Sequence, residues 1–124
     1  MKLYDENDKL VTCNERYREV YQTSREMIQE GRSFAEIINY GFSKGQYILD
    51  KAQAKMSAEE FVQQRIKLQR HSRHHSEELL DSGKWMRLVE RPIRGGGTVG
   101  LRVDITELKH KEQELALSRD QAEA

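Results

Sequence analysis

Three β-favouring segments follow one another in the C-terminal half of the chain, and the short turns between them constrain the fold more than any other feature. The segments are Glu77 to Asp81, Lys84 to Arg94 and Thr98 to Asp104, separated by Ser82-Gly83 and Gly95-Gly96-Gly97. Strands joined by turns this short pair in antiparallel fashion. The sequence therefore predicts a three-stranded antiparallel meander.

A hairpin is predicted at the N-terminal end. Leu3-Tyr4 and Leu10 to Cys13 are short β-favouring runs, and the segment between them consists of turn-forming residues. Asn14 follows the second run, and its short amide side chain can accept a hydrogen bond from a free amide in the first turn of a helix. We therefore expect a helix to begin directly after the hairpin.

Two further helix starts are marked by the motif S-x-x-E. Ser33 with Glu36, and Ser57 with Glu60, have the spacing of a capping box. In this motif the serine and glutamate side chains each bind the other residue's backbone amide. Two helices are therefore predicted between the hairpin and the meander.

The chain ends in a segment, Ile105 to Ala124, that contains no glycine or proline and favours a helix. Asp104 precedes it as a candidate cap. Leu108, Leu115 and Ala122 follow a heptad spacing, but Glu112 and Arg119 occupy the other positions of the heptad that should be apolar. Both an amphipathic terminal helix and a dimerising helix fit this pattern.

Composition limits the class of protein. The chain has 124 residues, which suits one domain, and its 21 basic residues balance its 21 acidic residues. This balance gives no reason to expect nucleic acid as a partner. Cys13 is the only cysteine, and no apolar run is long enough to cross a membrane. We expect a cytoplasmic domain without direct membrane contact, cut from a longer protein.

The order of these elements, together with several short motifs, resembles the PAS domain. The most specific motif is Gly100 to Glu107, which resembles the last PAS strand running into its Asp-Ile-Thr signature. Supporting matches are Tyr4-Asp5, Val11 to Asn14, Gly83 to Leu88, and Arg91-Pro92. The resemblance covers nearly the whole chain.

This resemblance implies an α+β fold with a five-stranded antiparallel sheet, short helices on one of its faces and a C-terminal connector helix. Residues 1–104 would form the sensory domain and residues 105–124 the signalling helix. It also implies a signal-input role in a bacterial signalling protein, without catalytic activity in this chain. The domain would bind a small ligand, dimerise, or do both.

The resemblance also suggests which output domain the chain controls. Leu117 to Ala124 resembles connectors that lead into the dimerisation helices of histidine kinases. We therefore rank a histidine kinase ahead of a diguanylate cyclase. A ligand-free module that only holds two output domains together is the alternative.

In PAS domains the residue two before the signature aspartate points into the cavity beneath the helices, which makes Arg102 an inward residue. A buried guanidinium needs a partner. Arg102 either pairs with Glu90 as a structural ion pair, or binds a carboxylate or phosphate of a small anionic ligand. The predicted ligand-binding residues are Arg102, Glu90, Leu88 and Met86.

Two further sets of residues follow from the same alignment of strands. Asp104, Ile105 and Thr106 are expected to relay a signal from the last strand to the helix. The opposite face of the sheet would then expose a strip of apolar side chains, which we expect a second subunit to cover in a homodimer. This strip consists of Val89, Val99, Leu101 and Val103.

Other kinds of site receive little support. His71, His74 and His75 are spaced for a shared metal ion, but no cysteine or nearby carboxylate completes the set, and basic residues surround them. No metal site is predicted, and the cofactor is left undetermined. PAS relatives that bind haem or covalent flavin place the ligating histidine on the long helix or the reactive cysteine in a recognisable motif, so the resemblance disfavours both cofactors here. No catalytic triad or phosphate-binding loop is present. The aromatic residues expected in the core are Tyr17, Phe34, Tyr40 and Trp85.

Overall fold

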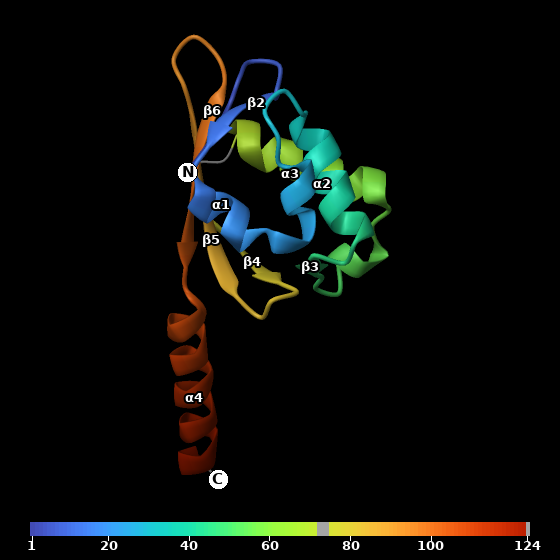
Figure 1. The fold of residues 1–124 in the computed structure, drawn as a ribbon. Helices are drawn as coiled ribbons and strands as arrows, with labels where there is room; N and C mark the ends of the chain where they lie inside the picture. The colour runs from blue at the N-terminus through green and yellow to red at the C-terminus, as the bar shows by residue number, and fades with distance from the viewer. Residues whose placement is uncertain (72–74, 124) are drawn as a thin grey trace.

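The computed structural model describes residues 1–71 and 75–123, and it shows a curved antiparallel sheet with helices on one face (Figure 1). The strand order is β2-β1-β6-β5-β4-β3. The elements are β1 (Lys2–Tyr4), β2 (Leu10–Cys13), α1 (Glu15–Val20), η1 (Gln22–Met27), α2 (Phe34–Ser43), β3 (Tyr47–Ile48), η2 (Gln53–Lys55), α3 (Ala58–His71), β4 (Ser76–Leu80), β5 (Trp85–Pro92), β6 (Thr98–Asp104) and α4 (Thr106–Glu123).

The sheet has six strands where five were expected. The extra strand, β3, has only two residues, and it pairs with Leu79 and Leu80 at the edge of β4. A two-residue strand is too short to show the alternating pattern by which strands are found in a sequence. The expected α+β architecture is otherwise present.

The predicted meander is confirmed. β6 has the expected bounds, while β4 begins one residue earlier than expected and β5 is slightly shorter at both ends. The turn between β5 and β6 requires glycine at Gly97, where φ is +89° and an added Cβ would lie 2.5 Å from the carbonyl oxygen of Tyr4. This close approach lets β1 pair with β6.

The predicted helix caps are also confirmed. The Asn14 side chain accepts a hydrogen bond from the Tyr17 amide at 3.1 Å, which starts α1. Ser57 and Glu60 bind each other's backbone amides, both at 3.2 Å, and so form a complete capping box at α3. Ser33 accepts from the amide three residues later at 3.1 Å. Local sequence therefore sets where three helices begin.

The hydrophobic core lies between the helices and the inner face of the sheet. Tyr17 and Phe34 are buried there as expected. Tyr40 and Trp85 are only half-buried, which corrects the expectation that they belong to the core. Tyr40 directs its hydroxyl to Glu26 at the surface, and Trp85 lies on the outer face of β5, because its inward neighbour in the strand is Met86.

The helix α4 leaves the sheet at the end of β6 and extends away from the rest of the molecule (Figure 1). Leu115 and Leu117 are more than 60% exposed along it. Within residues 1–71 and 75–123, no helix is both long enough and apolar enough to span a membrane.

Candidate functional site

Arg102 points inward from β6 and forms a buried ion pair with Glu90 on β5. Its Nη1 atom lies 2.7 Å from Glu90 Oε1, and the two side chains are 3% and 5% exposed. Its Nε atom donates to the Tyr21 hydroxyl at 2.6 Å, and the guanidinium lies 5.7 Å from the centre of the Tyr17 ring. The inward position and the pairing with Glu90 are thus confirmed. A ligand-binding role for Arg102 stays a prediction.

Lys2 on β1 joins the same pair, and the sequence analysis missed it. Its Nζ atom lies 3.2 Å from Glu90 Oε1 and donates to Gln69 Oε1 at 2.6 Å. It also lies 4.5 Å from the centre of the Phe34 ring. The side chain is completely buried, so two cations share one carboxylate. Gly100 makes room for them, since a Cβ there would lie 2.5 Å from Lys2 Cε.

The pKa values of Lys2 and Glu90 are both lowered, which favours the neutral form of the lysine and the charged form of the glutamate. Burial lowers the pKa of Lys2 to about 7, and the positive charge of Arg102 acts in the same direction. Burial also opposes ionisation of Glu90. The charges of Arg102 and Lys2 outweigh that effect, so the pKa of Glu90 lies below its usual value. Glu90 is therefore a carboxylate at neutral pH.

A second buried ion pair lies nearby. Arg65 on α3 places its Nη2 atom 3.1 Å from Glu78 Oε1 on β4, and the side chains are 7% and 9% exposed. The Tyr21 hydroxyl donates to Glu78 Oε2 at 3.2 Å. Because the same hydroxyl accepts from Arg102, Tyr21 connects the two ion pairs. The interior beneath the helices therefore contains one continuous polar network.

The four residues predicted to bind ligand occupy neighbouring places on the inner face. Leu88 is opposite Arg102 across β5 and β6, and Glu90 is opposite Gly100. Met86 is buried beside Leu88 on the same strand. Met86 and Arg102 also line a small pocket of about 90 Å³. The strands thus bring the predicted residues together, and their binding function stays untested.

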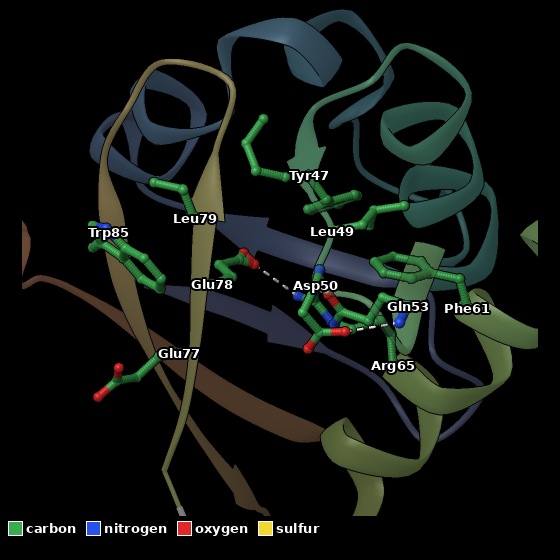
Figure 2. A pocket seen from close by; sticks show the side chains of 11 residues that line it. Tyr47, Leu49, Asp50, Gln53, Phe61, Arg65, Glu77, Glu78, Leu79 and Trp85 are labelled. Carbon is green, nitrogen blue, oxygen red and sulfur yellow. Dashed lines mark hydrogen bonds and ion pairs between the residues drawn. The ribbon is translucent and has the colours of Figure 1, made fainter. Parts of the chain in front are cut away.

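A larger pocket, of about 210 Å³, lies at the edge of the sheet between β4 and α3 (Figure 2). Glu78 and Arg65 face each other there. We call this the edge pocket. Its lining residues are Tyr47, Ile48, Leu49, Asp50, Gln53, Phe61, Arg65, Glu77, Glu78, Leu79 and Trp85. It could not be predicted from the sequence, because its walls come from five separate elements and one loop.

The signature residues Asp104, Ile105 and Thr106 join α4 to the sheet. The Asp104 carboxylate accepts from the Thr106 amide at 2.9 Å and from its hydroxyl at 2.6 Å. The Thr106 hydroxyl in turn accepts from the Trp85 amide at 3.0 Å. Ile105 is buried and donates its amide to the Trp85 carbonyl at 2.9 Å. The start of α4 is therefore hydrogen-bonded to the first residue of β5.

The first turn of α4 is also attached through a side chain. Lys109 pairs with Glu77 on β4, and its Nζ atom lies 5.1 Å from the centre of the Trp85 ring. Glu77 lies 3.7 Å from Arg87 of β5 as well. These contacts hold the first turn of α4 against the outer face of β4 and β5.

The outer face carries the apolar strip that was predicted. Leu101 is 50% exposed and Val103 is 45% exposed, while Val89 and Val99 are half-buried. Leu101 is opposite Val89 in the sheet, so the strip crosses both strands. No helix among the described residues lies over it (Figure 1).

The structure describes two of the three clustered histidines. His71 and His75 are exposed, and His74 lies outside the described residues. In the part of the chain that the structure describes, no group of three or more His, Cys, Asp or Glu side chains is placed to hold a metal ion.

Comparison with known proteins identifies the family. A family model described as the PAS fold matches residues 1–113. No curated protein matches the chain significantly. No solved structure does so either. The match covers the whole sheet, the helices upon it and the start of α4, and the chain therefore belongs to the PAS-fold family, whose members are generally non-catalytic sensory and signalling modules.

Proposed function

We propose that this chain is the signal-input domain of a signal-transduction protein, and that α4 carries the signal to an output domain that follows it. The observation that carries the proposal is the attachment of α4 to the sheet. Thr106 binds both Asp104 at the end of β6 and the amide of Trp85 at the start of β5. A change in the relative position of these two strands must therefore move the first turn of the helix.

The buried network gives such a change a place to originate. Arg102 lies two residues before Asp104 on the same strand, and its partner Glu90 lies on β5. Whatever alters this ion pair acts on the two strands to which α4 is attached. Charged pairs in the interior are sensitive to such changes, because the loss of one partner leaves the other unpaired at a cost of about 3–5 kcal/mol.

We propose a homodimer in which the apolar strip of Val89, Val99, Leu101 and Val103 is covered by a second subunit. An exposed apolar patch on a sheet is typical of an interaction surface. α4 then lies beside its counterpart, and its weak heptad pattern suits a helix pair that can change register. The resemblance of residues 117–124 to kinase connectors favours a histidine kinase as the output domain over a diguanylate cyclase.

The buried polar network is compatible with two kinds of domain, one without a ligand and one that binds a small anion. If the polar network is only structural, the domain is a ligand-free dimerisation module, and the mutual pairing of its buried charges favours this reading. If instead a small anion binds at Arg102, it must displace Glu90 from the guanidinium. Arg102→Ala then abolishes both the binding of inorganic phosphate or acetate and the accompanying rise in melting temperature.

Sedimentation velocity and hydrogen exchange test the proposal. Leu101→Lys should convert a dimer into a monomer, because it places a charge within the strip, while Leu117→Lys, at an exposed position of α4 outside the heptad seam, serves as a matched control. Thr106→Val should speed amide exchange in the first turn of α4 and leave β5 and β6 protected. A monomeric unmodified chain, or unchanged exchange in Thr106→Val, contradicts the dimer or the relay respectively.

A further inference from the structure

The edge pocket lies beside β4, at the point where the short edge strand β3 ends. β3 pairs only with Leu79 and Leu80, and on the side away from β5 the described residues provide no strand beside the first part of β4. The space beside that part of β4 is bordered by η2 and α3 instead (Figure 2). The pocket therefore reaches from the buried Arg65–Glu78 pair to the outer face, where Trp85 lies.

The charges of the lining are unbalanced. Asp50, Glu77 and Glu78 supply three carboxylates, and Arg65 is the one cation among the lining residues of this described pocket, so the formal charge is −2. The guanidinium of Arg65 is already engaged, since it faces Glu78 and lies 5.2 Å from the centre of the Tyr47 ring. Glu77 is also shared with Lys109 and Arg87, so Asp50 and Glu78 are the carboxylates left to attract a cation, and the lining favours a cationic molecule over an anionic one.

The buried end of the pocket carries an acceptor that is not fully used. Glu78 Oε1 makes the ion contact with Arg65 but accepts no hydrogen bond of good geometry from the described residues. The Glu78 side chain is only 9% exposed. A buried carboxylate oxygen without a hydrogen bond is costly, which favours a ligand that donates one.

The walls are aromatic and the space is small. Tyr47, Phe61 and Trp85 present rings to the pocket, and cations are attracted to the faces of such rings. A volume of about 210 Å³ is that of roughly seven water molecules at about 30 Å³ each, and it is below the range of drug-sized ligands. An ammonium group on a single ring or a short apolar chain fits these limits.

From this combination we infer that the edge pocket binds a small organic cation, with its ammonium group directed at Glu78 and Asp50 and its apolar part against the aromatic rings. The residues involved differ from Arg102 and its neighbours. The inference deepens the proposed function, and the signalling consequence of binding rests on that function.

The pocket is directly connected to α4. The Trp85 ring lines the pocket, while the Trp85 amide and carbonyl bind Thr106 and Ile105. Glu77 also lines it and pairs with Lys109, whose ammonium lies over the Trp85 ring. The apolar part of a bound cation competes with Lys109 for the Trp85 ring. Binding should therefore loosen the first turn of α4.

Trp85 is the only tryptophan of the chain and its ring lines this pocket, so its fluorescence reports binding there. We would titrate the chain with benzylamine, which is a cation at pH 7, and with benzyl alcohol and benzoate as neutral and anionic probes of similar size. Saturable quenching by benzylamine with a dissociation constant of about 1 mM is expected from its few atoms. An equal response to benzyl alcohol or benzoate, or none to benzylamine, overturns the inference.

Two variants locate the binding site. Asp50→Asn keeps the side-chain oxygen that accepts from the Gln53 amide at 2.8 Å and removes only the charge. Binding of benzylamine should weaken by roughly two- to fivefold, as for an exposed ion pair. Glu78→Gln should weaken it by about tenfold or more, because its carboxylate is buried. Asp120→Asn on the exposed surface of α4 is the matched control and should have no effect.

If Glu78→Gln fails to fold, as judged by circular dichroism, Asp50→Asn decides the matter alone. Unchanged binding in Asp50→Asn overturns the placement of the site. Amide exchange over residues 106–110 separates the two proposals. Faster exchange with benzylamine supports the connection to α4, whereas binding without any change in exchange overturns that connection and leaves the cation site standing.

Discussion

Replacing Lys2 by methionine should change the stability of the domain in opposite directions at low and high pH. Lys2 is completely buried, and its pKa falls from an ordinary 10.5 to about 7. At 1.36 kcal/mol per pKa unit, the charged form is disfavoured in the folded state by about 5 kcal/mol. Below pH 7 the lysine is protonated in both states, and the native domain bears this cost in full.

The sign of the pH dependence follows from proton binding. Between pH 7 and 10.5 the folded state releases the proton of Lys2 while the unfolded state keeps it. The unfolded state then binds more protons, so the free energy of unfolding rises with pH, by up to 1.36 kcal/mol per unit. By pH 9.5 the unmodified domain should have gained about 3 kcal/mol from this group.

Lys2→Met removes the charge and keeps the apolar stem. It also leaves two buried acceptors, Gln69 Oε1 and one oxygen of Glu90, without this donor, at a total cost of about 3 kcal/mol. The variant should therefore be about 2 kcal/mol more stable than the unmodified domain at pH 6, and about 1 kcal/mol less stable at pH 9.5.

Urea unfolding at both pH values, followed by circular dichroism, measures the difference. Lys9→Met is the control, because Lys9 is exposed and the same charge is lost. A Lys2→Met variant that is less stable at pH 6, or one whose difference from the unmodified domain is the same at both pH values, would refute the reasoning.

Two further predictions concern the same network. Gly100→Ala should lower the free energy of unfolding by roughly 2–5 kcal/mol in urea, because the new Cβ collides with Lys2 and Glu90; a loss below 1 kcal/mol would show that the ion pairs can shift at little cost. Tyr21→Phe removes the acceptor of the Arg102 Nε hydrogen bond, 2.6 Å long, and should cost about 1–3 kcal/mol in the same assay, whereas an unchanged midpoint would mean that the two ion pairs do not depend on this hydroxyl.

The parts of the fold that could be predicted depend on residues close together in the sequence. The capping boxes, the glycine turns and the alternation along β5 and β6 are local patterns, and the structure follows them. Alternation along β6 separates Arg102 from the apolar residues Leu101 and Val103, but only the resemblance to the PAS domain indicated that the face with Arg102 points inward. Its partner Glu90 followed from pairing the two strands of one hairpin.

Lys2 was missed because its environment is set by distant contacts. A lysine in a short first strand ordinarily lies at the surface. Here β1 lies between β2 and β6, and Lys2 is opposite Gly100, which has no side chain to fill the space beneath the helices. The sequence did contain a signal, because Lys2 lies two residues before the buried Tyr4 and so shares its face.

The edge pocket could not be predicted for a related reason. Its polar pair joins Arg65 on α3 to Glu78 on β4, and its rim depends on where the two-residue strand β3 ends. Neither feature has a periodic pattern. The histidine cluster was easier to see in the sequence, yet His71 and His75 are exposed.

The two buried ion pairs differ in a way that bears on signalling. The Arg65–Glu78 pair is balanced, because one cation faces one carboxylate. Glu90 faces two cations, so the group of Glu90, Arg102 and Lys2 keeps an excess positive charge while Lys2 is protonated. Only the unbalanced group includes a residue of β6, Arg102, and β6 is the strand that leads into α4. A change in charge or ligand at the Arg65–Glu78 pair reaches β6 through the Tyr21 hydroxyl, which binds Arg102. A ligand that contacts Trp85 in the edge pocket acts on α4 directly, because the Trp85 amide binds Thr106. The edge pocket therefore has the shorter route to the helix, and the polar network sets how firmly the strands resist its movement.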